Sequence, residues 1–274
     1  MVKKILFYIF IVIAFVAIAA WLVIGWSFLV EPNLLTVNNL RIEDKELKGL
    51  KIVFVTDFHI CADGKERLQK IIDKINLQKA DIVLLGGDYI VNDIFDNHTM
   101  AAKDIAENIL KIKAKYGVFA VLGNHDYSFG AHKTFAKAFK DTHVKLMDNQ
   151  NCLVNIDEKQ LCIVGISDFS SGKNNVEKAF EGATKPAVAF THSPDIFSSI
   201  PSYVNYTFAG HTHGGQVCLP LWGPLARPRH LLGKYVMGCY EENNKRMFVS
   251  KGVGTSHLNV RFFAVPEIVV AEFY

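Results

Sequence analysis

Five short apolar runs in this chain are each followed within two residues by glycine or by a side chain that binds metal ions. The runs cover residues 51–56, 82–85, 118–122, 187–190 and 206–209. Their length and their β-branched residues predict strands that are mostly buried. In an open α/β sheet, binding sites form just beyond the carboxyl ends of the strands. We therefore expect the residues that follow these five runs to meet in one site.

Amphipathic segments between the early runs predict helices. Residues 65–78 and 99–113 both carry apolar side chains at helical spacing. This alternation predicts parallel βαβ units. We expect a hairpin from residues 151–156 and 161–166, and further strands at 247–250, 259–263 and 267–273. Half of the 274 residues are hydrophobic and no repeat or linker divides residues 31–274, so we expect one α/β domain with mixed sheets and outer helices.

The motifs after the five runs are individually of uneven specificity. In chain order they are Asp57-Phe58-His59, Gly86-Gly87-Asp88, Gly123-Asn124-His125-Asp126, Thr191-His192 and Gly210-His211-Thr212-His213-Gly214-Gly215. An Asp-x-His alone is consistent with a surface ion pair at a strand end, and a Gly-Asp alone with an ordinary turn. The histidine pair of the last motif alone is consistent with a single structural zinc. As an ordered set, the five motifs have few competing explanations.

This ordered set resembles the calcineurin-like metallophosphoesterase superfamily over about residues 50–273. The long motif that begins at Gly210, and the tail from Val249 to Phe262, are similar to a membrane-anchored or exported branch of phosphodiesterases. Some members of that branch are UDP-2,3-diacylglucosamine hydrolases of lipid A synthesis. The resemblance implies a four-layer α/β/β/α sandwich.

The resemblance also implies a role for each motif residue. One divalent ion (Mn, Fe or Zn) is expected on Asp57, His59 and His213, and a second on Asn124, His192 and His211, with Asp88 bridging the two. His125 is expected to contact the phosphate or to protonate the leaving group, and Asp126 to orient the imidazole of His125. The implied reaction is in-line attack of a metal-bridging hydroxide on a phosphodiester or pyrophosphate.

Candidate substrate contacts lie next to these motifs. Tyr89 follows the expected bridging carboxylate. The segment 219–230 contains Trp222, Arg227 and Arg229, and we expect it to touch acyl chains or the bilayer while its arginines meet phosphates. An ordinary proline-rich surface loop explains that segment equally well. The remaining histidines, among them His257, are expected to be solvent-exposed or capping residues.

The N-terminal segment 5–30 contains no charged residue. A helix of that length exceeds the roughly 30 Å hydrocarbon core of a bilayer, and Trp21 and Trp26 are typical of its interface. We expect a single membrane anchor over residues 1–30. The alternatives are a cleaved signal peptide, since 17–19 reads Ala-Ile-Ala, and a buried helix.

The flanking charges give an orientation. Lys3 and Lys4 precede the span and favour a cytoplasmic N-terminus with an exported catalytic domain, although Arg41, Lys45 and Lys48 oppose that bias. A UDP-linked substrate would require a cytoplasmic domain, whereas an exported domain favours an envelope phosphodiester without UDP. The net charge of +3 is too small to indicate a nucleic-acid partner. A membrane-held module that binds a phosphorylated partner without catalysis is the remaining alternative.

Overall fold

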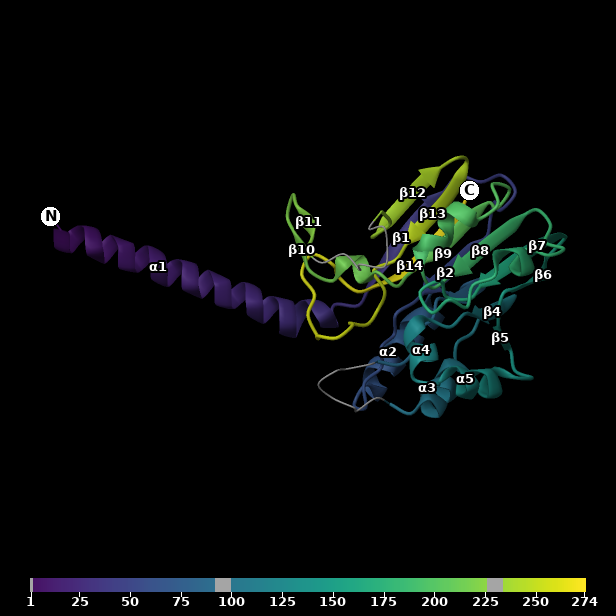
Figure 1. The fold of residues 1–274 in the computed structure, drawn as a ribbon, viewed down its shortest axis with the longest axis horizontal. Helices are drawn as coiled ribbons and strands as arrows, with labels where there is room; N and C mark the ends of the chain where they lie inside the picture. The colour runs from purple at the N-terminus through teal and green to yellow at the C-terminus, as the bar shows by residue number, and fades with distance from the viewer. Residues whose placement is uncertain (1, 92–99, 226–233) are drawn as a thin grey trace.

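A computed structural model of the chain describes residues 2–91, 100–225 and 234–274. Its N-terminal helix α1 (Val2–Gly25) projects away from the folded part of the chain, and none of its residues is buried (Figure 1). A π-helical turn, η1 (Trp26–Val30), and a short 3-10 helix, η2 (Glu31–Asn33), extend it. Among the described residues, this continuous stretch is the one helix long and apolar enough to cross a bilayer.

The first sheet has the strand order β1-β14-β2-β3-β4-β5. Its strands are β1 (Thr36–Ile42), β14 (Glu267–Phe273), β2 (Lys51–Val55), β3 (Ile82–Leu85), β4 (Gly117–Ala120) and β5 (Val144–Leu146). Strands β2 to β5 are parallel, β14 runs antiparallel to β2, and β1 runs parallel to β14. The sheet is therefore mixed, as the sequence predicted.

The second sheet has the order β12-β13-β9-β8-β7-β6. Its strands are β12 (Gly238–Glu242), β13 (Lys245–Val249), β9 (Tyr206–Ala209), β8 (Ala187–Thr191), β7 (Lys159–Ile166) and β6 (Gln150–Ile156). The four inner strands are parallel and the two outer pairs are antiparallel. A small hairpin, β10 (Cys218–Leu219) and β11 (Gly223–Pro224), stands apart from both sheets.

Three apolar cores separate four layers. One core packs α2 (Lys65–Leu77), α3 (Ala102–Ile109) and α5 (His132–Phe139) on the outer face of the first sheet. A second core joins the two sheets, with the rings of Phe54 and Phe208 5.5 Å apart. A third packs α6 (Val176–Ala179) and the 3-10 helix η3 (Pro194–Ser199) on the second sheet. The expected four-layer α/β/β/α sandwich is confirmed.

Several local predictions differ from the structure. Residues 259–263 form no strand and make only a single bridge, between Phe262 and Val217. The buried side chain of Arg261 hydrogen-bonds to carbonyls of this loop, and Phe263 has a positive φ of 53°. Both features prevent a continuous strand. Helix α3 begins at Ala102 and ends at Ile109, inside the expected 99–113, and residue 99 lies outside the described residues. Strand β1 was not predicted, since its half-exposed edge position leaves it without an apolar run.

Candidate metal centre

The ends of five parallel strands deliver the expected ligands to one place. Asp57 and His59 follow β2, Asp88 follows β3, and Asn124 begins the short helix α4 (Asn124–Ser128) after β4. From the second sheet, His192 follows β8, while His211 and His213 follow β9. Both sheets contribute because their parallel strands end on the same side of the sandwich. The seven side chains expected from the sequence therefore lie together, and three overlapping groups among them and His125 have the donor spacing of metal sites.

The first group consists of Asp57, His59 and His213. His213 Nε2 lies 3.4 Å from Asp57 Oδ1 and 3.1 Å from His59 Nε2. All three residues are buried. Two neutral imidazoles and a carboxylate, aimed at one point without solvent, form a donor set suited to a divalent transition ion.

The second group consists of Asp88, His192 and His211, with Asn124 beside it. His192 Nε2 lies 3.0 Å from His211 Nδ1, 3.1 Å from Asn124 Oδ1 and 3.2 Å from Asp88 Oδ2. The same Asp88 oxygen is 3.4 Å from His59 Nε2 of the first group. Asp88 therefore lies between the two groups, where its carboxylate can ligate an ion in each.

Left-handed backbone conformations bring most of these side chains to the centre. Positive φ angles occur at Asp57 (56°), His59 (44°), Asp88 (53°), His211 (71°) and His213 (51°). A non-glycine residue in this region carries about 1 kcal/mol or more of strain. Its repetition at five expected ligands indicates that the fold holds them in place against their local preference.

Glycines make room for the two carboxylates. A Cβ added at Gly123 would lie 2.1 Å from Asp88 Oδ1, and one at Gly252 would lie 2.6 Å from the Cβ of Asp57. Gly252 also has a φ of +69°. These positions require glycine because the backbone of one loop passes directly against a ligand from another.

The titration of the buried ligands is strongly perturbed. Burial raises the pKa of Asp57 to about 6 and lowers the pKa of His59 to about 3. Burial alone would raise the pKa of Asp88, but the neighbouring His192 outweighs it and holds that pKa well below its usual value. For His192, burial opposes the charged form, but Asp88 and Asp57 raise its pKa well above normal.

The residues present fit divalent cations. Two pairs of imidazole nitrogens, His59 with His213 and His192 with His211, face each other at 3.1 and 3.0 Å. Two such facing nitrogens are stabilised either by one hydrogen between them or by a cation that accepts both lone pairs, and the neighbouring carboxylates of Asp57 and Asp88 suit the cation. His192 Nδ1 donates to the carbonyl of Gly86 at 2.8 Å, which leaves its Nε2 free to ligate.

His125 lies at the edge of the centre. Its Nε2 is 3.9 Å from Asp88 Oδ2, and its ring meets that of His59 edge-on at 4.7 Å. Its side chain keeps 11% of its surface exposed, and burial lowers its pKa. The ring of His257, an exposed residue that the sequence analysis set aside, is 6.3 Å from that of His125. No signal in the sequence pairs His257 with the motifs, because it lies seven residues beyond the predicted strand 247–250 and not directly at its end.

Asp126 does not have the role expected from the sequence. It is fully buried, and its carboxylate accepts the backbone N–H groups of Asp88 (2.9 Å), Tyr89 (3.0 Å) and Gly123 (2.9 Å). These bonds fasten the start of α4 to the loop after β3. Asp126 is thus a positioning residue for Asp88 rather than a partner of the His125 imidazole.

The expected substrate contacts have different outcomes. Tyr89 is fully buried against Phe58 and Phe135, and its hydroxyl donates to the carbonyl of Val121, so it cannot reach a substrate. That prediction was wrong because the strand end turns Tyr89 into the core. Trp222 is 85% exposed on the β10–β11 hairpin. Arg227 and Arg229 lie outside the described residues.

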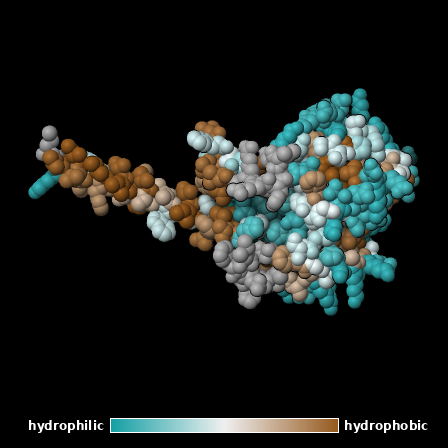
Figure 2. Space-filling view, in the orientation of Figure 1, coloured by the Kyte–Doolittle hydropathy of each residue, from teal (hydrophilic) through white to brown (hydrophobic). Residues whose placement is uncertain are grey.

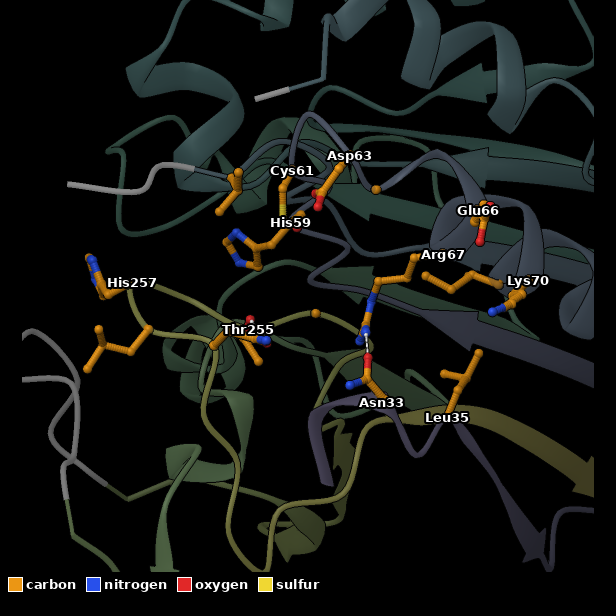
Figure 3. Close-up of a pocket in the computed structure, with 16 residues that line it drawn as sticks. Asn33, Leu35, His59, Cys61, Asp63, Glu66, Arg67, Lys70, Thr255 and His257 are labelled. Atoms are coloured by element: carbon orange, nitrogen blue, oxygen red, sulfur yellow. Dashed lines mark hydrogen bonds between the residues drawn. The ribbon is translucent and has the colours of Figure 1, made fainter. Parts of the chain in front are cut away.

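A cavity of about 550 Å³ opens beside His59. Figure 3 shows His59, Arg67 and His257 around it, with Asn33 and Leu35 from the segment that follows the N-terminal helix. Arg67 donates to Asn33 Oδ1 and to the carbonyl of Pro32, which fixes that segment against α2. The cavity therefore extends from the candidate metal centre to the end of the N-terminal helix.

Comparisons with known proteins agree with this geometry. The calcineurin-like phosphoesterase family matches residues 50–215. The chain is 29% identical to the uncharacterized metallophosphoesterase YkuE of Bacillus subtilis, covering 90% of this chain and 88% of YkuE. It is 30% identical to the phosphodiesterase YaeI of Escherichia coli, covering 81% of each. It is 25% identical to the UDP-2,3-diacylglucosamine pyrophosphatase LpxG of Chlamydia muridarum, covering 89% of this chain and 91% of LpxG. The chain belongs to the calcineurin-like phosphoesterase family and is a metal-dependent phosphoester hydrolase.

Proposed function

We propose that this chain is a membrane-anchored hydrolase of phosphodiester or pyrophosphate bonds that uses two divalent ions. The observation that carries the proposal is the position of Asp88 Oδ2, 3.4 Å from His59 Nε2 and 3.2 Å from His192 Nε2. A carboxylate between two histidine groups is the arrangement that a shared, bridging ligand requires. Two ions together lower the pKa of a water molecule and stabilise negative charge on a phosphoryl group.

The ligands divide between the two ions by proximity. Asp57, His59 and His213 would hold one, and Asn124, His192 and His211 would hold the other, with Asp88 shared. Asp57 is fixed for this task by the backbone N–H of His211, which lies 3.1 and 3.0 Å from its two oxygens. Mixed nitrogen and oxygen donors suit Mn, Fe or Zn without distinguishing them.

His125 is the residue best placed to move a proton. It lies beside Asp88 but retains some exposure, whereas the histidines at the heart of the two groups are buried more deeply. Burial lowers its pKa, so its protonated form is a stronger acid toward the leaving oxygen than an exposed imidazolium. His257, near the His125 ring, lies where it can contact the same phosphoryl group or its substituent.

The anchor favours a substrate that is lipid-linked. The helix Val2–Asn33 has the length and composition of a membrane span, and a tethered domain meets lipid phosphates at high local concentration. The name of LpxG makes UDP-2,3-diacylglucosamine, a precursor of lipid A, one candidate, and it requires a domain facing the cytoplasm. Lys3 and Lys4 favour an exported domain, for which an envelope phosphodiester, in keeping with the name of YaeI, is the alternative.

Metal content and turnover test this proposal together. The full chain, purified in detergent and reconstituted with Mn or Zn, should bind two ions and hydrolyse a soluble aryl phosphodiester. Asp88→Asn should lose at least one ion and most of the turnover. Asp73→Asn, on the exposed face of α2, is the matched control and should keep both. One ion or none in the reconstituted wild type would refute the two-ion assignment.

His125→Ala separates catalysis from binding alone. The variant should keep both ions, because His125 is not among the assigned ligands, and should lose turnover. A wild-type protein that binds two ions and a phosphate ester but turns nothing over would instead be a binding module. A topology reporter fused after Tyr274 would then decide which side of the membrane, and so which substrates, the domain can reach.

A further inference from the structure

Exposed apolar side chains gather where the N-terminal helix enters the folded domain. They come from three segments, residues 26–33, 216–225 and 254–264, which we call the collar. The exposed apolar residues of the collar are Trp26, Phe28, Leu29, Val30, Leu219, Leu221, Trp222, Leu225, Leu258 and Phe263. Figure 2 shows brown, apolar atoms at the base of the helix, on the side of the domain from which the helix leaves. A contiguous apolar surface of this kind marks an interaction site.

Hydrogen bonds fasten the three segments of the collar to one another. The N–H of Arg261 donates to the carbonyl of Ser27 at 2.9 Å, and that of Ala264 donates to the buried carboxylate of Glu31 at 2.7 Å. The N–H of Cys218 donates to the carbonyl of Phe262 at 2.7 Å. The backbone segments that carry the apolar side chains of the collar are therefore hydrogen-bonded to one another.

The β10–β11 hairpin presents the most exposed of these side chains. Leu221 is fully exposed at a positive φ of 68°, and its neighbour Trp222 is 85% exposed. In Figure 1 the hairpin and the 254–264 loop lie on the helix side of the domain, away from β6 and β7. Burying large apolar side chains is favourable, so leaving several in water at a hairpin tip is unfavourable unless something covers them.

We propose that the collar docks on the lipid bilayer, in the leaflet interface from which the N-terminal helix emerges. The helix argues for this occupant, since it is continuous with the collar, carries no charged residue from Ile5 to Gly25 and has no buried residue in α1. Whatever medium surrounds the end of the helix also meets the collar. Tryptophan and leucine on a rigid turn suit the interface, where aromatic side chains collect.

Docking would also orient the candidate metal centre. The cavity beside His59 has Asn33, from the end of the helix, and Leu258, from the collar, among its lining residues. A docked domain therefore holds the cavity against the head-group layer, with the exposed Lys70 available to anionic groups. The substrate class is then a phosphoester carried by a membrane lipid, a consequence that rests on the proposed function, whereas the docking does not.

Fluorescence of Trp222 tests the docking directly. The chain has three tryptophans, so Trp21→Phe/Trp26→Phe leaves Trp222 as the only one. The full chain with these changes is reconstituted in vesicles of phosphatidylcholine with or without bromine on the acyl chains. Bromine should lower the Trp222 emission about two-fold, as expected for a side chain at the acyl boundary. A thermal melt checks that the loss of the Trp26–Glu31 hydrogen bond leaves the domain folded.

Two further variants in that background make the test specific. Leu221→Asp/Phe263→Asp should abolish the bromine effect, while the helix keeps the protein in the vesicle. Leu153→Asp is the matched control, since Leu153 is a half-exposed leucine on β6 and its change should leave the quenching intact. Unquenched emission from the folded parent protein would overturn the proposal. Emission shielded from aqueous acrylamide but not quenched by bromine, with cross-links between chains, would assign the collar to a second copy and also overturn it.

The docking and the proposed function fail separately. Quenching without metal-dependent turnover leaves the docking standing and removes the phosphoesterase assignment. Turnover of a soluble phosphodiester without quenching removes the docking and leaves the assignment standing.

Discussion

Replacing Asp57 by asparagine should make the metal-free protein more stable. Burial raises the pKa of Asp57 to about 6, against 3.8 for an ordinary aspartate. The protonated carboxyl is therefore favoured in the folded state, so its stabilising effect is present below pH 3.8 and is lost as the pH rises through 6. At about pH 8, without metal, the buried charge destabilises the fold by about 3 kcal/mol, because a tenfold change in proton affinity corresponds to about 1.4 kcal/mol.

Asparagine removes that charge and fits the same position. Its side-chain carbonyl can still accept the His211 N–H, and asparagine tolerates the positive φ of 56°. We expect Asp57→Asn to raise the unfolding temperature of the chelated full chain by roughly 6–12 °C at pH 8, since 1 kcal/mol corresponds to about 2–4 °C in a domain of this size. At pH 4 most of the difference should vanish, because the wild-type carboxyl is then protonated.

Asp88 provides a control of opposite sign. Its pKa lies well below normal because His192 outweighs burial, so its ionised form stabilises the fold above the ordinary pKa and stops doing so as the pH falls. Asp88→Asn should therefore lower the stability of the metal-free protein at pH 8. Added Mn or Zn should make the wild type more stable than Asp57→Asn, since the wild type gains metal-binding free energy that the variant loses. An Asp57→Asn protein no more stable than the wild type in chelator at pH 8, or equally stabilised at both pH values, would refute the reasoning.

Three other substitutions probe separate parts of the same frame. His192→Ala should halve the bound metal and lower kcat/KM on a soluble diester by about 100-fold or more, measured by elemental analysis and steady-state kinetics; full metal content would contradict the ligand assignment. Gly123→Ala should displace Asp88, because Asp88 Oδ1 would lie 2.1 Å from the new Cβ, and should lower the activity by about 100-fold. Gly25→Ala, which has open space around it, is the control and should leave the activity unchanged. Arg261→Met leaves the carbonyls of Gly254, Ala264 and Lys251 without their hydrogen-bond donor. It should lower the free energy of unfolding, measured by urea titration, by about 3 kcal/mol or more. An unchanged urea midpoint would show that those carbonyls find other partners.

The strands that carry the ligands could be predicted because their pattern is local. Residues 82–85 and 206–209 are strands β3 and β9 with the expected bounds, since each is a short apolar run closed by glycine. Parallel strands buried on both faces have this pattern. The location of one site at their carboxyl ends then follows from topology alone, and His59, Asp88 and His192 do meet there.

The contacts that each side chain makes with residues distant in the sequence could not be predicted. Asp126 carries no local sign that its carboxylate accepts three backbone N–H groups rather than an imidazole. Tyr89 follows Asp88 directly, yet the turn sends the two side chains in opposite directions, one to the centre and one to the core. Arg261 is fully buried, although no local pattern indicates it, because carbonyls of three loop residues accept hydrogen bonds from its guanidinium.

Strand β1 connects the N-terminal helix to the candidate metal centre. It begins three residues after η2 ends and pairs along its whole length with β14, whose other neighbour is β2, the strand that presents Asp57. At the start of β14, the N–H of Glu267 donates to the carbonyl of Gly252, the glycine that packs against the Asp57 side chain. The helix and the ligand are thus joined by paired backbone rather than by a flexible linker. On the anchoring proposed above, a domain held this way keeps its candidate metal centre at a fixed distance from the bilayer, so the fold itself sets which substrate groups the centre can reach.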